Sequence, residues 1–432
     1  MSRSVVAGLA AASALFVALP GAAQAAAEPR VVSDVTIPAP PLSEFEQGLV
    51  KDDHGVKLGG VGSGLYPAQR RGEYWMVTDR GPNGEPKVNG EKRRTFPVPE
   101  FAPAIVKVAV RNGQARIART ITIKNADGTP ITGLSNLADH DEVPYSWDGQ
   151  TQLPYDPGGL DTEDLVTDGR GGFWLVEEYS PSLVHVGSDG RILARYVPEG
   201  LRLTAKYPVY DTLPAVFATR QQNRGFEALG VSRWEHALYL AVQSPLANPD
   251  KKTGKASSTS RILRVDLRTG RPTGEWAYTM ENVATFDPAA QQGDMKISAL
   301  NVLSPGRLLL QERTDAVARL YTVDLRQATN LLGRPETTPT LEQSVPSDVT
   351  VATKQLAVDL AAIPGLPGKI EGVALVDPWT LVIANDNDFG LGTFGPDGKL
   401  IDSGVASHLV TIRLAHPITG ARADATAQDD QE

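Results

Sequence analysis

Glu163-Asp164-Leu165, followed by Phe173-Trp174-Leu175-Val176 and then by Glu177-Glu178, is the stretch of sequence that decides the fold. It opens with an acidic residue, a small residue and an aliphatic residue, and 14 positions separate Glu163 from Glu177 at the polar end of the apolar run. Comparable units occur five times, with a serine in place of the acid in two of them. Their openings are Ser63-Gly64-Leu65, Glu163-Asp164-Leu165, Glu227-Ala228-Leu229, Ser298-Ala299-Leu300 and Glu371-Gly372-Val373. Internal repeats of this length, made of short strands, indicate the blades of a β-propeller.

Each unit predicts more than one hairpin. Polar residues follow each of the five apolar runs. They are Asp79, then Glu177 and Glu178, Gln243, Gln311 and Glu312, and Asn385 and Asp386. A third apolar element follows in every copy, and in four copies a turn and a further strand come next. The fifth copy lacks this last strand, which residues 31–37 can supply. We therefore expect an all-β propeller with five countable four-stranded blades, closed by an N-terminal strand, although a degenerate sixth blade in 125–160 or 334–362 is not excluded.

The ends of the chain differ in composition from the repeats. Residues 1–25 combine Arg3, an apolar segment and Ala23-Gln24-Ala25, which together predict a secretory signal peptide. We expect residues 26–418 to form one propeller domain with a surface insertion at about 125–160, and residues 419–432 to form a polar tail. The predicted protein is an exported monomer, periplasmic or extracellular, with no membrane span.

Composition excludes several classes of function. The chain carries 51 acidic and 42 basic residues and no cysteine. An acidic protein without a basic tract is a poor candidate for binding nucleic acid, and the absence of cysteine excludes disulfides, thiolate catalysis and cysteine-based metal sites. The six histidines show no metal-ligand spacing. Glycine and proline, at 41 and 32 residues, suit a fold with many tight turns, and we expect the aromatic residues Trp75, Trp174, Trp379 and Tyr239 to pack between blades.

The repeated polar positions are predicted to meet at one mouth of the central channel. In a propeller the first strand of each blade starts at this mouth and the second strand ends there, so their polar ends are cross-strand neighbours. This places Glu163 near Glu177 or Glu178, of which either can face the channel. It also places Glu371 near Asn385 or Asp386, and Glu227 near Gln243. Asp161 and Asp164, which flank Glu163, we expect to be solvated in a loop.

Like charges held this close require compensation by a cation or by basic side chains. Carboxylate and amide oxygens, including that of Asn385, suit a hard cation, above all calcium. The basic candidates beside the motifs are Arg80, Arg224, Lys296, Arg313 and Lys369. The alternative for the three repeated glutamates is a structural role in capping backbone amides, and for Asn385 and Asp386 it is a solvated turn.

Five of these motifs resemble the phytase-like family of secreted bacterial proteins, which is also described by an esterase-like activity of phytase. They are Thr78-Asp79-Arg80-Gly81, Asp161-Thr162-Glu163-Asp164-Leu165, Gly225-Phe226-Glu227-Ala228-Leu229, Lys369-Ile370-Glu371-Gly372-Val373 and Asn385-Asp386-Asn387. The resemblance covers roughly residues 55–415.

The resemblance implies a calcium-dependent propeller hydrolase of phosphate esters, in which metal activates water without a covalent enzyme intermediate. It implies catalytic roles for Glu163 and Glu371, and phosphate binding by Arg80, Arg224, Lys296, Arg313 and Lys369. The implied metal ligands, together with Asn385 from the reasoning above, are Asp79, Glu163, Glu178, Glu227, Glu371, Asn385 and Asp386. Ser63 and Ser298 depart from the acidic pattern at two of the five openings.

Two other functions remain open for a small-molecule ligand. One is a metal-dependent lactonase or carboxylesterase, which would need one metal and an apolar wall. The other is a non-catalytic propeller that binds a ligand in the same channel, because this fold hosts many functions. A serine esterase is disfavoured, because Gly62-Ser63-Gly64-Leu65 is not the Gly-x-Ser-x-Gly elbow of that class.

Overall fold

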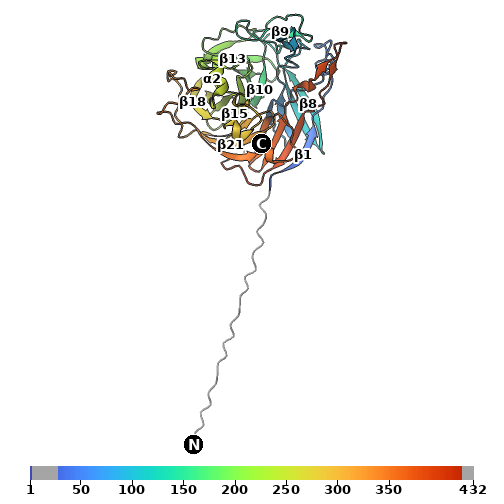
Figure 1. Ribbon diagram of the computed structural model, residues 1–432. Coiled ribbons are helices and arrows are strands. Elements are labelled where there is room, and N and C mark those ends of the chain that lie inside the picture. Colours follow the sequence, from blue (N-terminus) through green and yellow to red (C-terminus); the bar gives the residue numbers. More distant parts are fainter. Residues whose placement is uncertain (2–27, 421–432) are drawn as a thin grey trace.

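The structure, a computed structural model, is a ring of five β-sheets that are antiparallel except for one parallel strand pair at the edge of the second sheet (Figure 1). It describes Met1 and residues 28–420, so the predicted signal peptide at 1–25 and nearly all of the predicted tail at 419–432 lie outside the described residues. The first two blades contain β2 (Gly64–Pro67), β3 (Glu73–Val77), β7 (Ala104–Arg111) and β8 (Gln114–Thr122), and then β10 (Thr162–Thr167), β11 (Phe173–Glu177), β12 (Ser182–Val186), β13 (Ile192–Pro198) and β14 (Val209–Leu213). The third and fourth contain β15 (Phe226–Ser232), β16 (Ala237–Val242), β17 (Thr259–Asp266) and β18 (Pro272–Thr279), and then β19 (Lys296–Ser304), β20 (Arg307–Arg313), β21 (Ala318–Asp324) and β22 (Thr353–Asp359).

The fifth blade joins the two ends of the described chain. It contains β23 (Ile370–Asp377), β24 (Thr380–Asn385), β27 (His408–Arg413) and β1 (Arg30–Thr36), and β1 pairs antiparallel with β27. Figure 1 shows the blue N-terminal strand beside the red C-terminal strands. The innermost strands β2, β10, β15, β19 and β23 contact one another in a closed cycle. The predictions of five blades and of closure by the N-terminal strand are therefore confirmed, whereas the second blade has five strands, not the expected four, because β14 adds to its edge.

Apolar contacts between consecutive blades form the core. The buried hydrophobic residues fall into five clusters, one at each blade interface. Trp174 and Tyr239 are buried in two of these clusters, as predicted, and half-buried Trp75 packs edge-on against Phe173. The prediction for Trp379 was wrong: it is 39% exposed, because it lies in the turn between β23 and β24, where Arg413 covers its ring.

Short elements occupy the connections between the long strands. Residues 123–161, which connect β8 to β10, include β9 (Pro144–Ser146), which pairs in parallel with β6 (Arg94–Phe96) from the preceding connection. The remaining elements are β4 (Lys87–Val88), β5 (Glu91–Lys92), β25 (Thr393–Phe394), β26 (Leu400–Ile401), the α-helices α1 (Leu42–Phe45), α2 (Lys251–Ala256) and α3 (Val283–Phe286), and the 3₁₀ helices η1 (Ala215–Thr219), η2 (Gln292–Asp294), η3 (Leu360–Ala362) and η4 (Asp388–Gly390). Within the described residues, no helix has the length and apolar character needed to cross a membrane.

Candidate functional site

A β-bulge lies at the start of the innermost strand in four of the five blades. The pairing register shifts between Thr162 and Asp164, between Phe226 and Ala228, between Ile297 and Leu300, and between Ile370 and Gly372. The extra residue in the bulge is Glu163, Glu227 or Glu371 in three blades, and Ser298 and Ala299 fall within the shift in the other. A bulge leaves its extra residue outside the ladder and redirects the side chain. The repeated triplet of the sequence is thus the signature of a repeated bulge.

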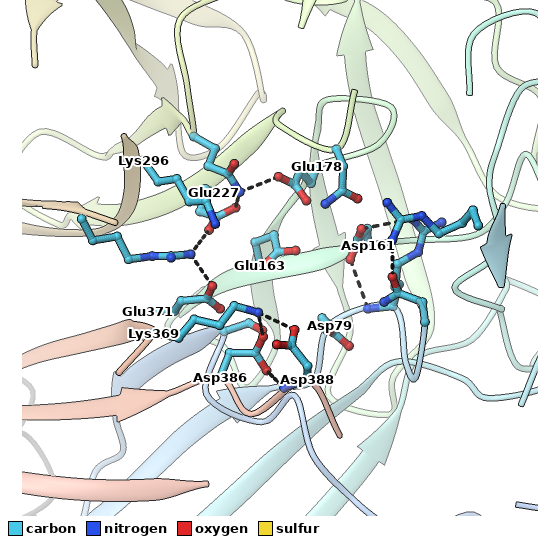
Figure 2. Close-up of a pocket in the computed structure, with 17 residues that line it drawn as sticks. Asp79, Asp161, Glu163, Glu178, Glu227, Lys296, Lys369, Glu371, Asp386 and Asp388 are labelled. Atoms are coloured by element: carbon cyan, nitrogen blue, oxygen red, sulfur yellow. Dashed lines mark hydrogen bonds and ion pairs between the residues drawn. The ribbon is translucent and has the colours of Figure 1, made fainter. Parts of the chain in front are cut away.

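Each blade adds a second polar side chain from the end of its second strand. These are Asp79, Glu178, Gln243, Arg313 and Asp386, and together with Ser63, Glu163, Glu227 and Glu371 they line a single cavity of about 200 Å³. Figure 2 shows Glu163 at its centre, with Glu227 and Glu371 on one side and Asp161 and Glu178 on the other. Every one of the 17 lining residues is polar or charged: Ser63, Asp79, Arg80, Asn83, Arg94, Asp161, Glu163, Glu178, Asn223, Glu227, Gln243, Lys296, Arg313, Lys369, Glu371, Asp386 and Asp388.

The structure decides which glutamate after Trp174 faces the cavity. Glu177 turns away and forms an ion pair of 2.8 Å with the buried Arg195. Glu178 lines the cavity, where its Oε1 accepts a hydrogen bond of 2.6 Å from the amide of Gln243. The same amide donates to Glu227 at 2.7 Å, so the predicted proximity of Glu227 and Gln243 is confirmed.

On the blade 4 side, Arg313 occupies the place that carboxylates hold in blades 1, 2 and 5. Its guanidinium is 1% exposed and donates to Ser298 Oγ at 2.6 Å, to Asp315 at 3.1 Å and to Glu371. Its Nη2 also lies 3.5 Å from Glu227 Oε1. Burial alone would lower the pKa of Arg313. Attraction to the carboxylates of Glu371 and Glu227 is the stronger effect and raises this pKa above its ordinary value.

Two lysines complete this cationic side of the cavity. Lys369, in the left-handed region at φ +49°, pairs with Asp386 at 2.5 Å and also with Asp388. Lys296 pairs with Asp315 at 3.0 Å. Lys369 and Lys296 thus lie at the cavity as predicted, although each already has acidic partners.

On the blade 2 side, three carboxylates converge with much less compensation. One oxygen atom from each of Asp161, Glu163 and Glu178 lies within 4.8 Å of the others, and the same holds for Glu163, Glu227 and Glu371. Burial first, and then repulsion from Glu227, raises the pKa of both Glu163 and Glu178 well above its usual value. A site composed only of carboxylate oxygens fits a hard divalent cation such as calcium.

Arg80 lies at the edge of this acidic group. Its guanidinium stacks over the ring of Tyr179 at 3.6 Å, and its Nε donates to the carbonyl of Gly133 at 2.8 Å. Nη1 is 3.5 Å from Asp161 but has no hydrogen-bond partner, although Arg80 is only 3% exposed. Arg80 is therefore held from several sides, and its Nη1 faces Asp161 without forming a hydrogen bond.

Two predicted site residues lie outside the cavity lining. The Asn385 amide donates to the carbonyl of Ala406 at 3.0 Å, and its oxygen accepts from the His408 backbone at 2.7 Å. Because its oxygen is engaged in this way, Asn385 joins two chain segments and does not present a metal ligand. Arg224 donates to Ser244 Oγ at 2.8 Å beside the cavity.

Sequence reasoning also missed residues that the fold brings to the site. Asp161 and Asp164 are buried and not solvated as expected. Asp161 joins the acidic group, whereas Asp164 accepts backbone hydrogen bonds from Leu165 and Leu229 and so ties blade 2 to blade 3. Arg94 and Asn83 reach the cavity from the loop between β3 and β7, where no repeat marked them.

Comparison with known proteins relates the chain to one family. A family model described as phytase-like, with esterase-like activity of phytase, matches residues 56–389. A relative from Arthroderma benhamiae, described as an uncharacterized secreted protein, is 25% identical over 362 residues, which cover 71% of this chain and 70% of the relative.

Among solved structures, the calcium-binding protein regucalcin from Agrobacterium tumefaciens is 12% identical, with coverage of 90% of this chain and 97% of that one and a TM-score of 0.36. A luciferin-regenerating enzyme is 11% identical, with coverage of 84% and 94% and a TM-score of 0.34. At this level of similarity neither structure bears on activity.

Proposed function

The chain belongs to the phytase-like family, and we propose that it is an exported, metal-dependent hydrolase of phosphate esters whose active site is the cavity at the channel mouth. Export is supported by the predicted signal peptide and by the description of the relative from Arthroderma benhamiae as secreted. Calcium is the proposed metal, because the available ligands are carboxylates.

Among the residues that the structure describes, no apolar side chain lines the cavity, and this observation carries the proposal. Ligand sites for apolar or aromatic groups present hydrophobic surface, whereas all 17 lining residues here are polar or charged. A lactone with an alkyl chain would find no apolar wall. A small, heavily hydroxylated or phosphorylated molecule would find donors and acceptors on every side.

The charge of the lining supports a need for a metal ion. Eight acidic and five basic residues leave a formal net charge of −3. A phosphate ester would be repelled from such a cavity unless a bound cation reversed the local charge. Asp161, Glu163 and Glu178 would hold this cation, because their oxygen atoms converge and, among the described residues, the only ion pair that a basic side chain forms with them is that of Arg80 with Asp161 at 3.5 Å.

The metal and the residues of the cavity would have separate roles in hydrolysis. A calcium ion bound there would draw the phosphoryl oxygens and lower the pKa of a bound water. The guanidinium of Arg80, whose Nη1 lies 3.5 Å from Asp161 without a hydrogen bond, would donate to a phosphoryl oxygen beside the acidic group. Glu371 Oε1 is held by Arg313, which leaves Oε2 to exchange a proton with water or with the leaving oxygen.

The test is phosphate release from phytate and from an aryl phosphate by mature protein stripped with chelator and then titrated with calcium. Calcium-restored release that falls at least ~100-fold in Glu163→Gln would support the proposal. Glu199→Gln, at an exposed site outside the cavity, is the matched control. A folded protein that releases no phosphate at any calcium concentration would contradict it.

A carboxylic ester is the second candidate substrate, because the family description includes an esterase-like activity. An aryl acetate assayed beside the two phosphate esters separates the two functions. Acetate release without phosphate release would replace the first proposal by the second. No turnover of any of the three substrates would favour a non-catalytic binding propeller.

A further inference from the structure

The cavity contains two candidate carboxylate triads that share one residue. The first triad is Asp161, Glu163 and Glu178, and the second triad is Glu163, Glu227 and Glu371. In each, one oxygen atom per residue lies within 4.8 Å of the others. Two acidic triads bridged by Glu163 would ordinarily suggest a pair of metal ions. The basic groups around them, however, are distributed unequally.

The second triad already has a cation. Arg313 comes from β20 and occupies the place, at the end of a second strand, from which Glu178 enters the first triad. Its Nη2 contacts Glu371 and lies 3.5 Å from Glu227. Ser298 Oγ accepts from Nε and donates to Glu227 at 3.1 Å, which fixes the guanidinium in the plane of these contacts. An arginine is permanently charged, so it neutralises the second triad at any physiological pH.

The first triad has no such occupant among the described residues. Gln243 donates a neutral hydrogen bond to Glu178, and Glu163 forms no ion pair with a basic side chain. Arg80 approaches Asp161 only from the edge, at 3.5 Å, because Tyr179 and Phe96 hold its guanidinium. Arg80 also lines the cavity, and its buried Nη1, 3.5 Å from Asp161, forms no hydrogen bond, so the charge of the first triad is less completely compensated than that of the second.

We propose that the cavity binds a single divalent cation, at Asp161, Glu163 and Glu178, and that Arg313 takes the place of a second one. This inference rests on the proposed metal dependence and adds the number of ions and their position. Blade 4 departs from the acidic pattern at both of its positions, with Ser298 and Arg313. These two residues show in the sequence that blade 4 supplies the guanidinium of Arg313 where the other triad would bind an ion.

Calcium stoichiometry tests the inference without reference to activity. Isothermal titration of chelator-stripped mature protein with calcium chloride should show one ion per wild-type chain. Arg313→Gln reproduces the neutral amide that blade 3 carries at Gln243, and it should bind a second ion. Arg313→Lys, which keeps the charge, is the matched control and should remain at one.

The outcomes separate this inference from the proposal on which it rests. Two ions on the wild type, or one ion on a folded Arg313→Gln, would overturn the inference and leave the metal dependence standing. No calcium on the wild type would overturn both.

A second pair of variants keeps the test decisive if Arg313→Gln does not fold. Glu178→Gln, in the first triad, should weaken calcium binding at least ~10-fold, because ligand charge sets calcium affinity. Glu371→Gln, in the second triad, should change it less than ~3-fold. The reverse order would place the ion in the second triad and overturn the inference.

Discussion

Glu177 and Glu178 are adjacent in the chain and almost completely buried, at 0% and 1% exposure, yet they lie in two very different environments. Both oxygens of Glu177 are occupied. Oε1 accepts from the backbone of Tyr179 at 2.9 Å, and Oε2 accepts from Ser182 at 3.1 Å and from Arg195 at 2.8 Å. Arg195 in turn donates to the Gly159 carbonyl and to Tyr207, among other acceptors, so the charge pair is fully satisfied.

The environment of Glu178 lacks this compensation. Its hydrogen-bond partner is the neutral Gln243. The nearby carboxylates of Glu227 and Asp161 repel it more strongly than Arg224 and Lys296, which form no ion pair with it among the described residues, attract it. Buried charges in proteins are normally paired, and an unpaired cluster that opens to a cavity indicates a binding site for something else. Burial of an acidic side chain therefore does not identify a functional site. A buried acidic side chain that lacks a basic partner to neutralise its charge does.

The largest expected effect comes from breaking the satisfied pair. Arg195→Met leaves Glu177 buried without its cation, and we expect a loss of about 3–5 kcal/mol in the free energy of unfolding. Urea unfolding followed by tryptophan fluorescence measures it. The double variant Glu177→Gln/Arg195→Met, which removes both charges, should recover part of the loss. A single-variant loss below about 1 kcal/mol would show that Glu177 and Arg195 do not depend on each other.

A third buried acid sharpens the comparison through pH. Glu46 accepts one hydrogen bond from the Ala102 backbone, its other oxygen has no partner, and burial raises its pKa to about 7. Its folded pKa is raised, so its stabilising contribution is complete below pH ~4.5 and is lost as the pH rises towards 7. Glu46→Gln should therefore match the wild type at pH 4 and exceed it by up to about 3 kcal/mol at pH 8.

Thermal and urea unfolding at both pH values measure this difference, with Glu44→Gln, exposed on α1 two residues before Glu46, as the control. Because Glu46 does not line the cavity, calcium should leave the difference unchanged. An equal gain in stability at pH 4 and pH 8 would show that the carboxyl group is not the cause.

The smallest expected effect comes from a change in the first triad, Asp161, Glu163 and Glu178. Removing one like charge by Glu163→Gln should stabilise the chelator-stripped protein by about 1 kcal/mol, because repulsion is relieved. Calcium at about 100 times its Kd should stabilise the wild type by about 2.7 kcal/mol and the variant much less. Thermal unfolding with and without calcium measures both. A variant that is less stable than the wild type in chelator would mean that Glu163 has a structural role.

Much of the fold follows from local sequence pattern. Alternating apolar runs, turn residues and a spacing of 14 to 16 residues between the paired polar ends, as from Glu163 to Glu177 and from Glu227 to Gln243, specify hairpins. Their fivefold recurrence specifies blades, and the missing last strand of the fifth copy predicted the pairing of β1 with β27. These features depend on neighbours along the chain, so one sequence is sufficient to find them.

The sequence by itself therefore determined the ring, its closure and the gathering of acids at one channel mouth. Only the tertiary structure decided which acids are compensated. Each bulge shifts the side-chain alternation by one residue, so whether Glu177 or Glu178 faces the cavity depends on the register of β10 with β11. The partners that distinguish the acids, such as Arg195 for Glu177 and Arg313 for Glu371, lie 18 and 58 residues away along the chain. Electrostatic compensation acts through space, and no local pattern in the sequence records it.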